Sequence, residues 1–375
     1  MTLAEAIESR RILLCVGSGG VGKTTTAAAI AVEAARRGRT TAVLTVDPAQ
    51  RLKDALGLGK LDARPRRVPL GSGRHLDALL LDVKRTFDEL VLGLASSPEQ
   101  ARRVLENRLY QNLSGTLTGT AEYMAVETVY RLAEEARYDL LVVDTPPARH
   151  AVDFLDAPRR LLALLDSRAF AILKDPTSIL PAAGSRLAHF LLSSVLRGLE
   201  RFTGIGLVRE IAEFIGAIEA LSEAFRDRVA AVGKLLRGPE TGLVLVTAPE
   251  PRLTSETREL AKALRTIGLP IHGVVVNRAL PRAVFGTAVA PPPPPVGLAP
   301  PLAARLARGY EDLRVLAARQ EATLAPLLAV AGAPLVAEVP LLPTAPGSIA
   351  DLQVIARHLF PTAADDAPPA SEVRL

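Results

Sequence analysis

The sequence predicts an α/β protein with a doubly wound, mainly parallel sheet and an inserted helical subdomain, and three observations lead to this prediction. Several short apolar runs lack the polar alternation of half-exposed strands, as expected for strands that are covered on both faces. Helix-favouring stretches separate these runs, which is the pattern of βαβ units. Hydrophobic residues make up 49% of the chain but aromatic residues only 4%, a composition that suits Val/Leu/Ala strands and helices.

Seven apolar runs are candidate strands. Five of them are expected to form buried parallel strands: 11–17, 40–47, 138–145, 242–248 and 271–277. A further strand is expected at 75–83 ("HLDALLLDV") and a last one at 333–340 ("APLVAEVP").

The connections between these strands are uneven in length. The chain from Val83 to Tyr138, and the chain from Asp156 to Gly242, are far longer than a crossover helix needs. Within the second connection, residues 185–202 and 207–225 carry apolar side chains at helical spacing. These amphipathic helices either bury their apolar faces against the sheet or form a groove for a partner.

Composition limits the classes of function. The net charge of +5 comes almost entirely from arginines spread along the chain, which favours solvated helix faces over a nucleic-acid surface. The one cysteine, Cys15, excludes an internal disulfide and a Cys-based metal cluster, and its apolar surroundings predict a buried core residue. No run approaches the length of a membrane span, and the N-terminus lacks a signal-peptide pattern, so we expect a cytoplasmic protein. The stretch 290–300 ("APPPPPVGLAP") predicts an exposed polyproline-type loop, serving as a spacer or as a docking site.

Residues 17–24 ("GSGGVGKT") match the phosphate-loop pattern GxxxxGK[ST], directly after an expected strand and before an alanine-rich stretch. The glycines let consecutive backbone N–H groups turn onto phosphate oxygens, and the helix N-terminus adds its dipole. We expect Lys23 to reach the β- and γ-phosphates and the Thr24 hydroxyl to bind Mg²⁺. The expected nucleotide-binding residues here are Gly17, Ser18, Gly19, Gly20, Val21, Gly22, Lys23, Thr24 and Thr25.

Two aspartates follow apolar runs and are expected at the carboxyl ends of parallel strands, where ligands bind. Asp144 is expected to hold the Mg²⁺ shell, through water. Asp47 is then free to orient or deprotonate an attacking water and is, with Lys23, the expected catalytic residue. The alternative for each aspartate is a helix N-cap.

Asn277 closes the run "GVVVN". A carboxamide can pair with the N6/N7 edge of adenine. Guanine-selecting enzymes place an aspartate three residues later, where this chain has Leu280, so the sequence favours ATP over GTP. The alternative is an asparagine that serves a turn after the strand.

Together these motifs resemble the ArsA-type ATPases, the family of the arsenite-pump ATPase and the tail-anchored-protein targeting ATPase. The resemblance extends over most of the chain and rests on several segments together: "GSGGVGKTT", "DPA" at 47–49, "DTPPARHAVDFL" at 144–155, "PEPRLTSETREL" at 249–260, "VVVN", and "VPLLP" at 339–343. It implies a SIMIBI-class fold, hydrolysis of ATP with Mg²⁺, a nucleotide-sandwich homodimer and a helical subdomain that opens and closes. It also implies that Glu250 contacts nucleotide and that Pro340 and Leu341 belong to a loop that closes over adenine.

The resemblance divides the chain by analogy with the family. The expected parts are an ATPase core at 1–84, a helical insertion at 85–137, core with switch II at 138–157, a second helical insertion at 158–237, core with adenine-binding loops at 238–360, and a disordered tail at 361–375.

Three departures from the family pattern matter. The chain has one phosphate loop, so two copies would have to pair, and it lacks both the thiols for As(III) and the cysteine pair of a zinc site. Ser18 stands where the family usually has a lysine that reaches the partner's phosphates. Either hydrolysis is slow or another cation supplies that charge. The candidates beside the switches are Arg51 and Arg149, which precedes His150.

The sequence therefore predicts a Mg²⁺-dependent ATPase, a homodimeric switch that handles a hydrophobic client or a membrane-associated partner. The large helical insertions favour this function. One alternative is a regulatory or positioning ATPase of the ParA/MinD kind, and another is the ATPase subunit of an arsenite-efflux pump. Contact with a membrane is expected only through a partner.

Overall fold

A computed structural model of the chain describes residues 2–107 except 48 and 50, 120–167, 221–286, 289, 291–293 and 297–361. It consists of two compact units. The first, here called the sheet unit, comprises Met1–Leu81, Arg131–Val152 and Arg237–Leu375. The second, the helical unit, comprises Asp82–Tyr130 and Asp153–Leu236.

The sheet unit contains an eight-stranded sheet, which confirms the predicted fold class. Its strands are β1 (Ile12–Gly17), β2 (Thr41–Thr45), β3 (Arg66–Gly71), β4 (Arg74–Leu80), β5 (Leu140–Asp144), β6 (Thr241–Thr247), β7 (Gly273–Ala279) and β8 (Leu335–Pro340). They lie in the order β3-β4-β2-β5-β1-β6-β7-β8, and all neighbours are parallel except β3 and β4. The seven predicted strands all form.

Strand β3 was not predicted, and its sequence explains why. Only Val68 is buried in "RRVPLG", and the strand contains Pro69, so it shows no apolar run. It pairs antiparallel with β4 through a tight turn at residues 71–74, at the edge of the sheet. Edge strands bury little surface, so hydrophobic patterning does not reveal them.

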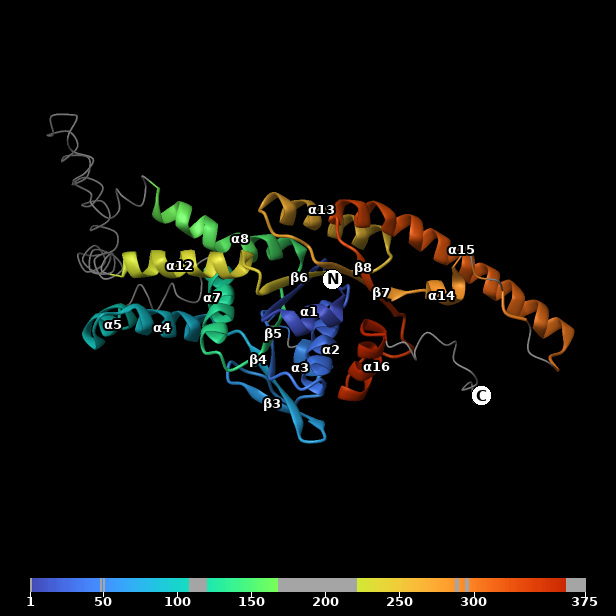
Figure 1. The fold of residues 1–375 in the computed structure, drawn as a ribbon, viewed down its shortest axis with the longest axis horizontal. Helices are drawn as coiled ribbons and strands as arrows, with labels where there is room; N and C mark the ends of the chain where they lie inside the picture. Colours follow the sequence, from blue (N-terminus) through green and yellow to red (C-terminus); the bar gives the residue numbers. More distant parts are fainter. Residues whose placement is uncertain are drawn as a thin grey trace, which may run out of the picture. The chain divides into compact units, whose positions relative to one another are not determined.

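Helices cover both faces of the sheet (Figure 1). The helices of the sheet unit are α1 (Leu3–Ser9), α2 (Lys23–Arg36), α3 (Arg51–Ala55), α13 (Pro251–Thr266), α14 (Arg282–Phe285), α15 (Pro300–Ala331) and α16 (Ile349–Leu359). Helices α2 and α16 lie on one face, α13 and α15 on the other. Helix α2 is buried nearly all round, and its run of small alanines lets it pack closely on the strands and on α16. Cys15 of β1 is fully buried in this core, as predicted.

The helical unit is built from α4 (Val83–Leu94), α5 (Pro98–Leu105), α7 (Thr120–Glu134), α8 (Ala148–Leu165) and α12 (Ser222–Arg237), some of which extend past its ends. A polar group lies inside it. The Glu127 carboxylate is almost fully buried and accepts hydrogen bonds from Arg228 and from the Tyr123 hydroxyl. Buried charges are tolerated where partners compensate them in this way.

Some predicted features lie wholly or mainly outside the described residues. These are the amphipathic stretch 185–202, the stretch 207–225 up to residue 220, and the tail after Pro361. The predicted polyproline loop has no helix or strand at its described positions before α15 begins at Pro300. In the part of the chain that the structure describes, no helix is long and apolar enough to span a membrane.

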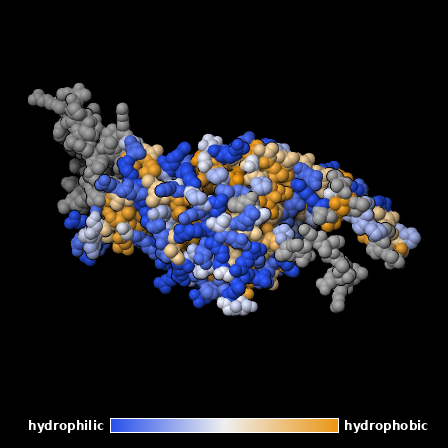
Figure 2. All heavy atoms as spheres, viewed as in Figure 1, coloured by the Kyte–Doolittle hydropathy of each residue, from blue (hydrophilic) through white to orange (hydrophobic). Residues whose placement is uncertain are grey.

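Exposed apolar side chains gather on α14 and the first half of α15. Figure 2 shows hydrophobic spheres among hydrophilic ones along this helix. The large exposed apolar residues there are Val284, Leu302, Leu306, Val315 and Leu316.

The close approach of β1 and β6 gives a prediction about stability. A Cβ added to Gly17 would lie 2.1 Å from the Val246 carbonyl oxygen, so Gly17→Ala must push the two strands apart. We expect the free energy of unfolding to fall by about 1–3 kcal/mol, measured by urea denaturation. Gly19→Ala, which meets nothing within 4 Å, is the control and should unfold as the parent does. If Gly17→Ala and the parent had the same urea midpoint, the two strands would not be this close.

Candidate functional site

The phosphate-loop residues connect β1 to α2 at the carboxyl end of the sheet, as expected for a ligand site in an open α/β sheet. Gly22 caps α2 in the left-handed conformation, with φ of 92°. A Cβ at this residue would lie 2.1 Å from the Asn277 side-chain nitrogen. Glycine is therefore required here for two reasons, backbone conformation and space. The first N–H groups of α2 follow this cap, and because such groups have no partner within the helix they suit an anion.

Lys23 is nearly buried, at 8% exposure, and its ammonium donates to the Ser18 carbonyl oxygen at 2.9 Å. Burial lowers the pKa of this ammonium, while the nearby Asp144 acts in the opposite direction. Among the described residues, the Ser18 carbonyl oxygen is the hydrogen-bond acceptor that holds this ammonium across the loop. A phosphate entering the loop would offer it a stronger, charged partner.

Asp144 ends β5 and is only 1% exposed. Its Oδ2 accepts hydrogen bonds from the hydroxyls of Thr24 and Thr45, both at 2.8 Å. Burial raises the pKa of this carboxyl to about 6, against the opposing effect of these hydroxyls and of Lys23. Its Oδ1 is buried and has no hydrogen-bond partner among the described residues. A carboxylate with one uncompensated oxygen beside a threonine hydroxyl supplies hard oxygen donors of the kind that Mg²⁺ prefers, so these residues fit the metal.

Asp47 lies just beyond β2, in an Asx turn. Its Oδ1 accepts the Ala49 N–H at 2.9 Å, and its Oδ2 is 3.8 Å from Nε of Arg51. The carboxylate therefore shapes the local turn and holds a cation beside the loop. Both the local role and a role toward substrate are compatible with this position.

Ser18 does not face outward. It is fully buried, and its hydroxyl shares a hydrogen bond of 3.2 Å with the Thr257 hydroxyl. It also donates to the Leu253 carbonyl oxygen at 3.4 Å. Ser18 thus fastens the phosphate loop to α13.

Asn277 and the residue after it contact the loop from β7. The Asn277 amide donates to the Val21 carbonyl oxygen at 2.8 Å, and the Arg278 guanidinium donates to the Gly20 carbonyl oxygen at 2.9 Å. The expected contact of Asn277 with a base stays a prediction. Arg278 was not identified from the sequence, since a single arginine after a strand carries no distinctive pattern.

A cavity of about 300 Å³ brings together most of the residues expected to act on phosphate and water. It is lined by Gly20, Gly22, Lys23, Thr24, Thr25, Asp47, Arg51, Asp54, Ala55, Thr145, Pro147, Ala345 and Pro346. Six of these lining residues were not predicted as site residues, because no pattern in the sequence marks them: Asp54, Ala55, Thr145, Pro147, Ala345 and Pro346.

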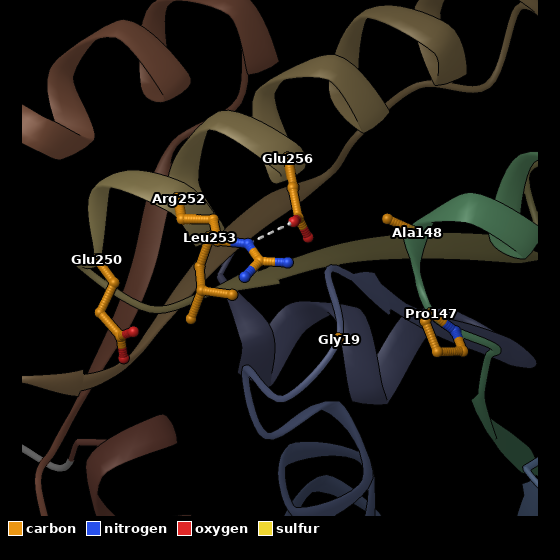
Figure 3. Close-up of a pocket in the computed structure, with 7 residues that line it drawn as sticks. All are labelled: Gly19, Pro147, Ala148, Glu250, Arg252, Leu253 and Glu256. Carbon is orange, nitrogen blue, oxygen red and sulfur yellow. Dashed lines mark hydrogen bonds and ion pairs between the residues drawn. The ribbon is translucent and has the colours of Figure 1, made fainter.

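Gly19 lines a second cavity, of about 410 Å³ (Figure 3). Helix α13 contributes Arg252, Leu253 and Glu256, with Glu250 at its N-cap, while Pro147 and Ala148 follow β5. Arg252 and Glu256 form an ion pair of 3.2 Å within the cavity wall. Glu250 therefore lies beside the loop, but in a different cavity from Lys23 and Asp47.

Pro340, Leu341 and His150 are not among the described residues that line these cavities. Pro340 ends β8, and Leu341 is 66% exposed, with its N–H donating to the Ala279 carbonyl oxygen. Arg149 and His150 occupy the first turn of α8, where His150 is exposed. The structure thus gathers the phosphate-loop residues, Asp47, Asp144 and Arg51, and does not bring Leu341 to them.

Comparison with known proteins identifies a matching family and several similar ATPases. Residues 10–287 match the ArsA ATPase family profile, described as anion-transporting ATPase. The chain is 28% identical over 269 residues to the ATPase GET3 of Phaeosphaeria nodorum, covering 70% of this chain and 75% of that protein. It is 26% identical over 265 residues to the ATPase get3 of Schizosaccharomyces japonicus, covering 70% of this chain and 73% of that protein. It is 25% identical over 284 residues to the ATPase ASNA1 homolog 1 of Paramecium tetraurelia, covering 74% of this chain and 78% of that protein.

The raised pKa of Asp144 gives a prediction for the protein without metal or nucleotide. Between pH 4 and 6 the folded chain binds a proton that the unfolded chain releases, so its stability falls as pH rises through this range. Asp144→Asn cannot ionise and should avoid that loss. We expect it to be more stable than the parent at pH 7 by up to about 3 kcal/mol, and by much less near pH 4. Urea unfolding at both pH values measures this, and an Asn variant less stable than the parent at pH 7 would contradict it.

Proposed function

Because the chain belongs to the ArsA family of anion-transporting ATPases and is itself an ATPase, we propose that its phosphate-loop cavity binds ATP with Mg²⁺ and hydrolyses it. One observation carries this proposal most directly. The buried Asp144 carboxylate meets the Thr24 hydroxyl at 2.8 Å and keeps one oxygen without a partner among the described residues. A purely structural aspartate would not leave that oxygen uncompensated.

Each residue of the cavity has a separate task in this proposal. Lys23 moves from the Ser18 carbonyl oxygen to the β- and γ-phosphates and offsets their charge. Thr24 and Asp144 would hold Mg²⁺, Asp144 through water. A bound Mg²⁺ neutralises charge on the phosphate oxygens. The N–H groups at the start of α2 orient the phosphate chain.

Asp47 is positioned to act on water. It lines the same cavity as Lys23 and Thr24, and its carboxylate is partly exposed there. A carboxylate so placed can accept a hydrogen bond from a water molecule. It can take the proton of that water as the water oxygen bonds to the γ-phosphorus and the bond from this phosphorus to the oxygen of the leaving ADP breaks. Nε of Arg51 lies 3.8 Å from Oδ2 of Asp47. The arginine can then turn toward the negative charge that develops on the phosphate oxygens and supply the cation that Ser18 lacks.

Several finer features follow from the family membership. We propose a homodimer whose opening and closing depend on bound nucleotide. The helical insertions at 85–137 and 158–237 would handle a hydrophobic client or a membrane-associated partner. The named relatives are GET3 and ASNA1 ATPases, and the extended helical insertions support this function over a positioning ATPase. A cytoplasmic location agrees with it. Arsenite is disfavoured as a ligand, since the one cysteine is fully buried and its thiol pKa is raised.

Lys23→Ala tests nucleotide binding. The substitution removes the ammonium that is expected to contact phosphate, so calorimetry should show ATP affinity falling at least tenfold, by about 1.4 kcal/mol or more. The matched control is Lys262→Ala, which removes an exposed lysine paired with Glu259 on α13 and should bind ATP as the parent does. If Lys23→Ala also binds as the parent does, this cavity is not the nucleotide site.

Asp47→Asn tests the chemical step. Asparagine retains the side-chain oxygen that holds the Ala49 N–H but cannot take a proton, so phosphate release should slow by about 10²-fold or more. ATP affinity should change little. Asp62→Asn is the control, because Asp62 accepts the Arg64 N–H in the same kind of turn at 2.9 Å and lies outside the cavity. Undiminished turnover in Asp47→Asn would assign water activation to a different group.

A further inference from the structure

Two neighbouring side chains at the end of β7 hold two successive carbonyl groups of the phosphate loop. Nη2 of Arg278 donates to the Gly20 oxygen at 2.9 Å, and Nδ2 of Asn277 donates to the Val21 oxygen at 2.8 Å. The Arg278 guanidinium also lies 3.4 Å from Glu250, the N-cap residue of α13. The arginine is therefore held between the loop and α13.

The backbone at Arg278 takes an unusual form that brings its side chain to the loop. Its φ is 58°, in the left-handed region that residues other than glycine seldom adopt. The β7–β8 register shifts between Asn277 and Ala279, which is the sign of a bulge at this residue. Bulges re-aim a side chain and are common beside functional sites. Without the bulge, consecutive residues of a strand would point to opposite faces of the sheet.

Peptide planarity converts these two hydrogen bonds into an orientation of N–H groups. In a trans peptide the C=O and the following N–H point in opposite directions. Fixing the Gly20 carbonyl toward Arg278 directs the Val21 N–H away from β7, and fixing the Val21 carbonyl toward Asn277 does the same for the Gly22 N–H. Gly20 and Gly22 line the 300 Å³ cavity with Lys23. Successive N–H groups of this kind form a concave anion site.

We propose that Arg278 is a positioning residue, which holds the Gly20–Val21 peptide so that the Val21 N–H is ready for phosphate. This rests on the proposed function of the cavity. Asn277 does the same for the next peptide. The arginine acts through the loop backbone. It orders the binding site before nucleotide arrives and so reduces the conformational entropy that binding would otherwise cost. ATP and ADP, which share the phosphates next to the loop, should benefit equally.

The test compares side-chain variants of residue 278 that respect its backbone. Arg278→Gly removes the guanidinium without adding strain at a positive φ, and Arg278→Lys retains a donor and a charge. Arg265→Ala is the matched control, because Arg265 likewise donates to a backbone carbonyl, that of Val330 at 2.9 Å, far along α13 from the loop. All three variants should have a urea denaturation midpoint close to that of the parent. An effect on the loop can then be told apart from a general loss of stability.

Two measurements decide the proposal. In nucleotide-free protein, the ¹⁵N order parameter of the Val21 amide should fall from the range of rigid backbone to below about 0.6 in Arg278→Gly, while Arg278→Lys and Arg265→Ala keep the parent value. Calorimetry should show ATP and ADP affinities both lowered about tenfold in Arg278→Gly and within about threefold of the parent in the other two.

The outcomes separate this inference from the proposed function. A rigid Val21 amide in Arg278→Gly, or unchanged ATP and ADP affinities, overturns the positioning role even if Lys23→Ala abolishes binding. Loss of ATP affinity alone, with ADP retained, also overturns it, because the effect would then belong to the γ-phosphate. If the parent itself binds no nucleotide, the proposed function fails, and the order parameter still decides whether Arg278 holds the loop.

Discussion

The buried carboxylate of Asp144 is the interaction on which the rest of the site depends. The parallel register places it beside Cys15 of β1 and Thr45 of β2, and Thr24 approaches it from the first turn of α2. Two hydroxyls stabilise one of its oxygens, and the neighbouring Lys23 ammonium favours its ionised form. Burying a carboxylate this completely is costly unless charge and hydrogen bonds compensate it. The remaining oxygen has no hydrogen-bond partner among the described residues, and it is the basis of the proposed metal site.

The phosphate loop is supported from two directions. Helix α13 holds it through the hydroxyl contacts of Ser18 with Thr257, and the end of β7 holds it through Asn277 and Arg278. A loop of glycines would otherwise have many conformations, and ordering it on binding would oppose affinity. These contacts fix the loop before a ligand arrives. They also couple its conformation to α13, where Glu250 faces the second cavity.

The distribution of charge around the loop is distinctive. The second position of the loop carries a buried serine hydroxyl. The loop's own cation is Lys23 at its end, and Arg51 and Arg278 lie on neighbouring elements. Of these, Arg51 lines the cavity together with Asp47, and Arg278 contacts the loop backbone. These three cations come from three elements: the start of α2, α3 and the end of β7. Each cation can respond separately to movement of the element that carries it.

The sequence by itself determined the parallel sheet, the phosphate loop and the place of Asp144 at the end of a strand. Each depends on local rules: continuous apolar residues in strands covered on both faces, glycines where the backbone turns onto an anion, and carboxylates at strand ends. Only the tertiary structure decided that Ser18 turns inward, that β3 adds an antiparallel edge, and that Arg278 reaches Gly20. The reason is physical. A side chain's partner depends on strand order and on a bulge that shifts one register, and neither leaves a pattern within the segment that carries the residue.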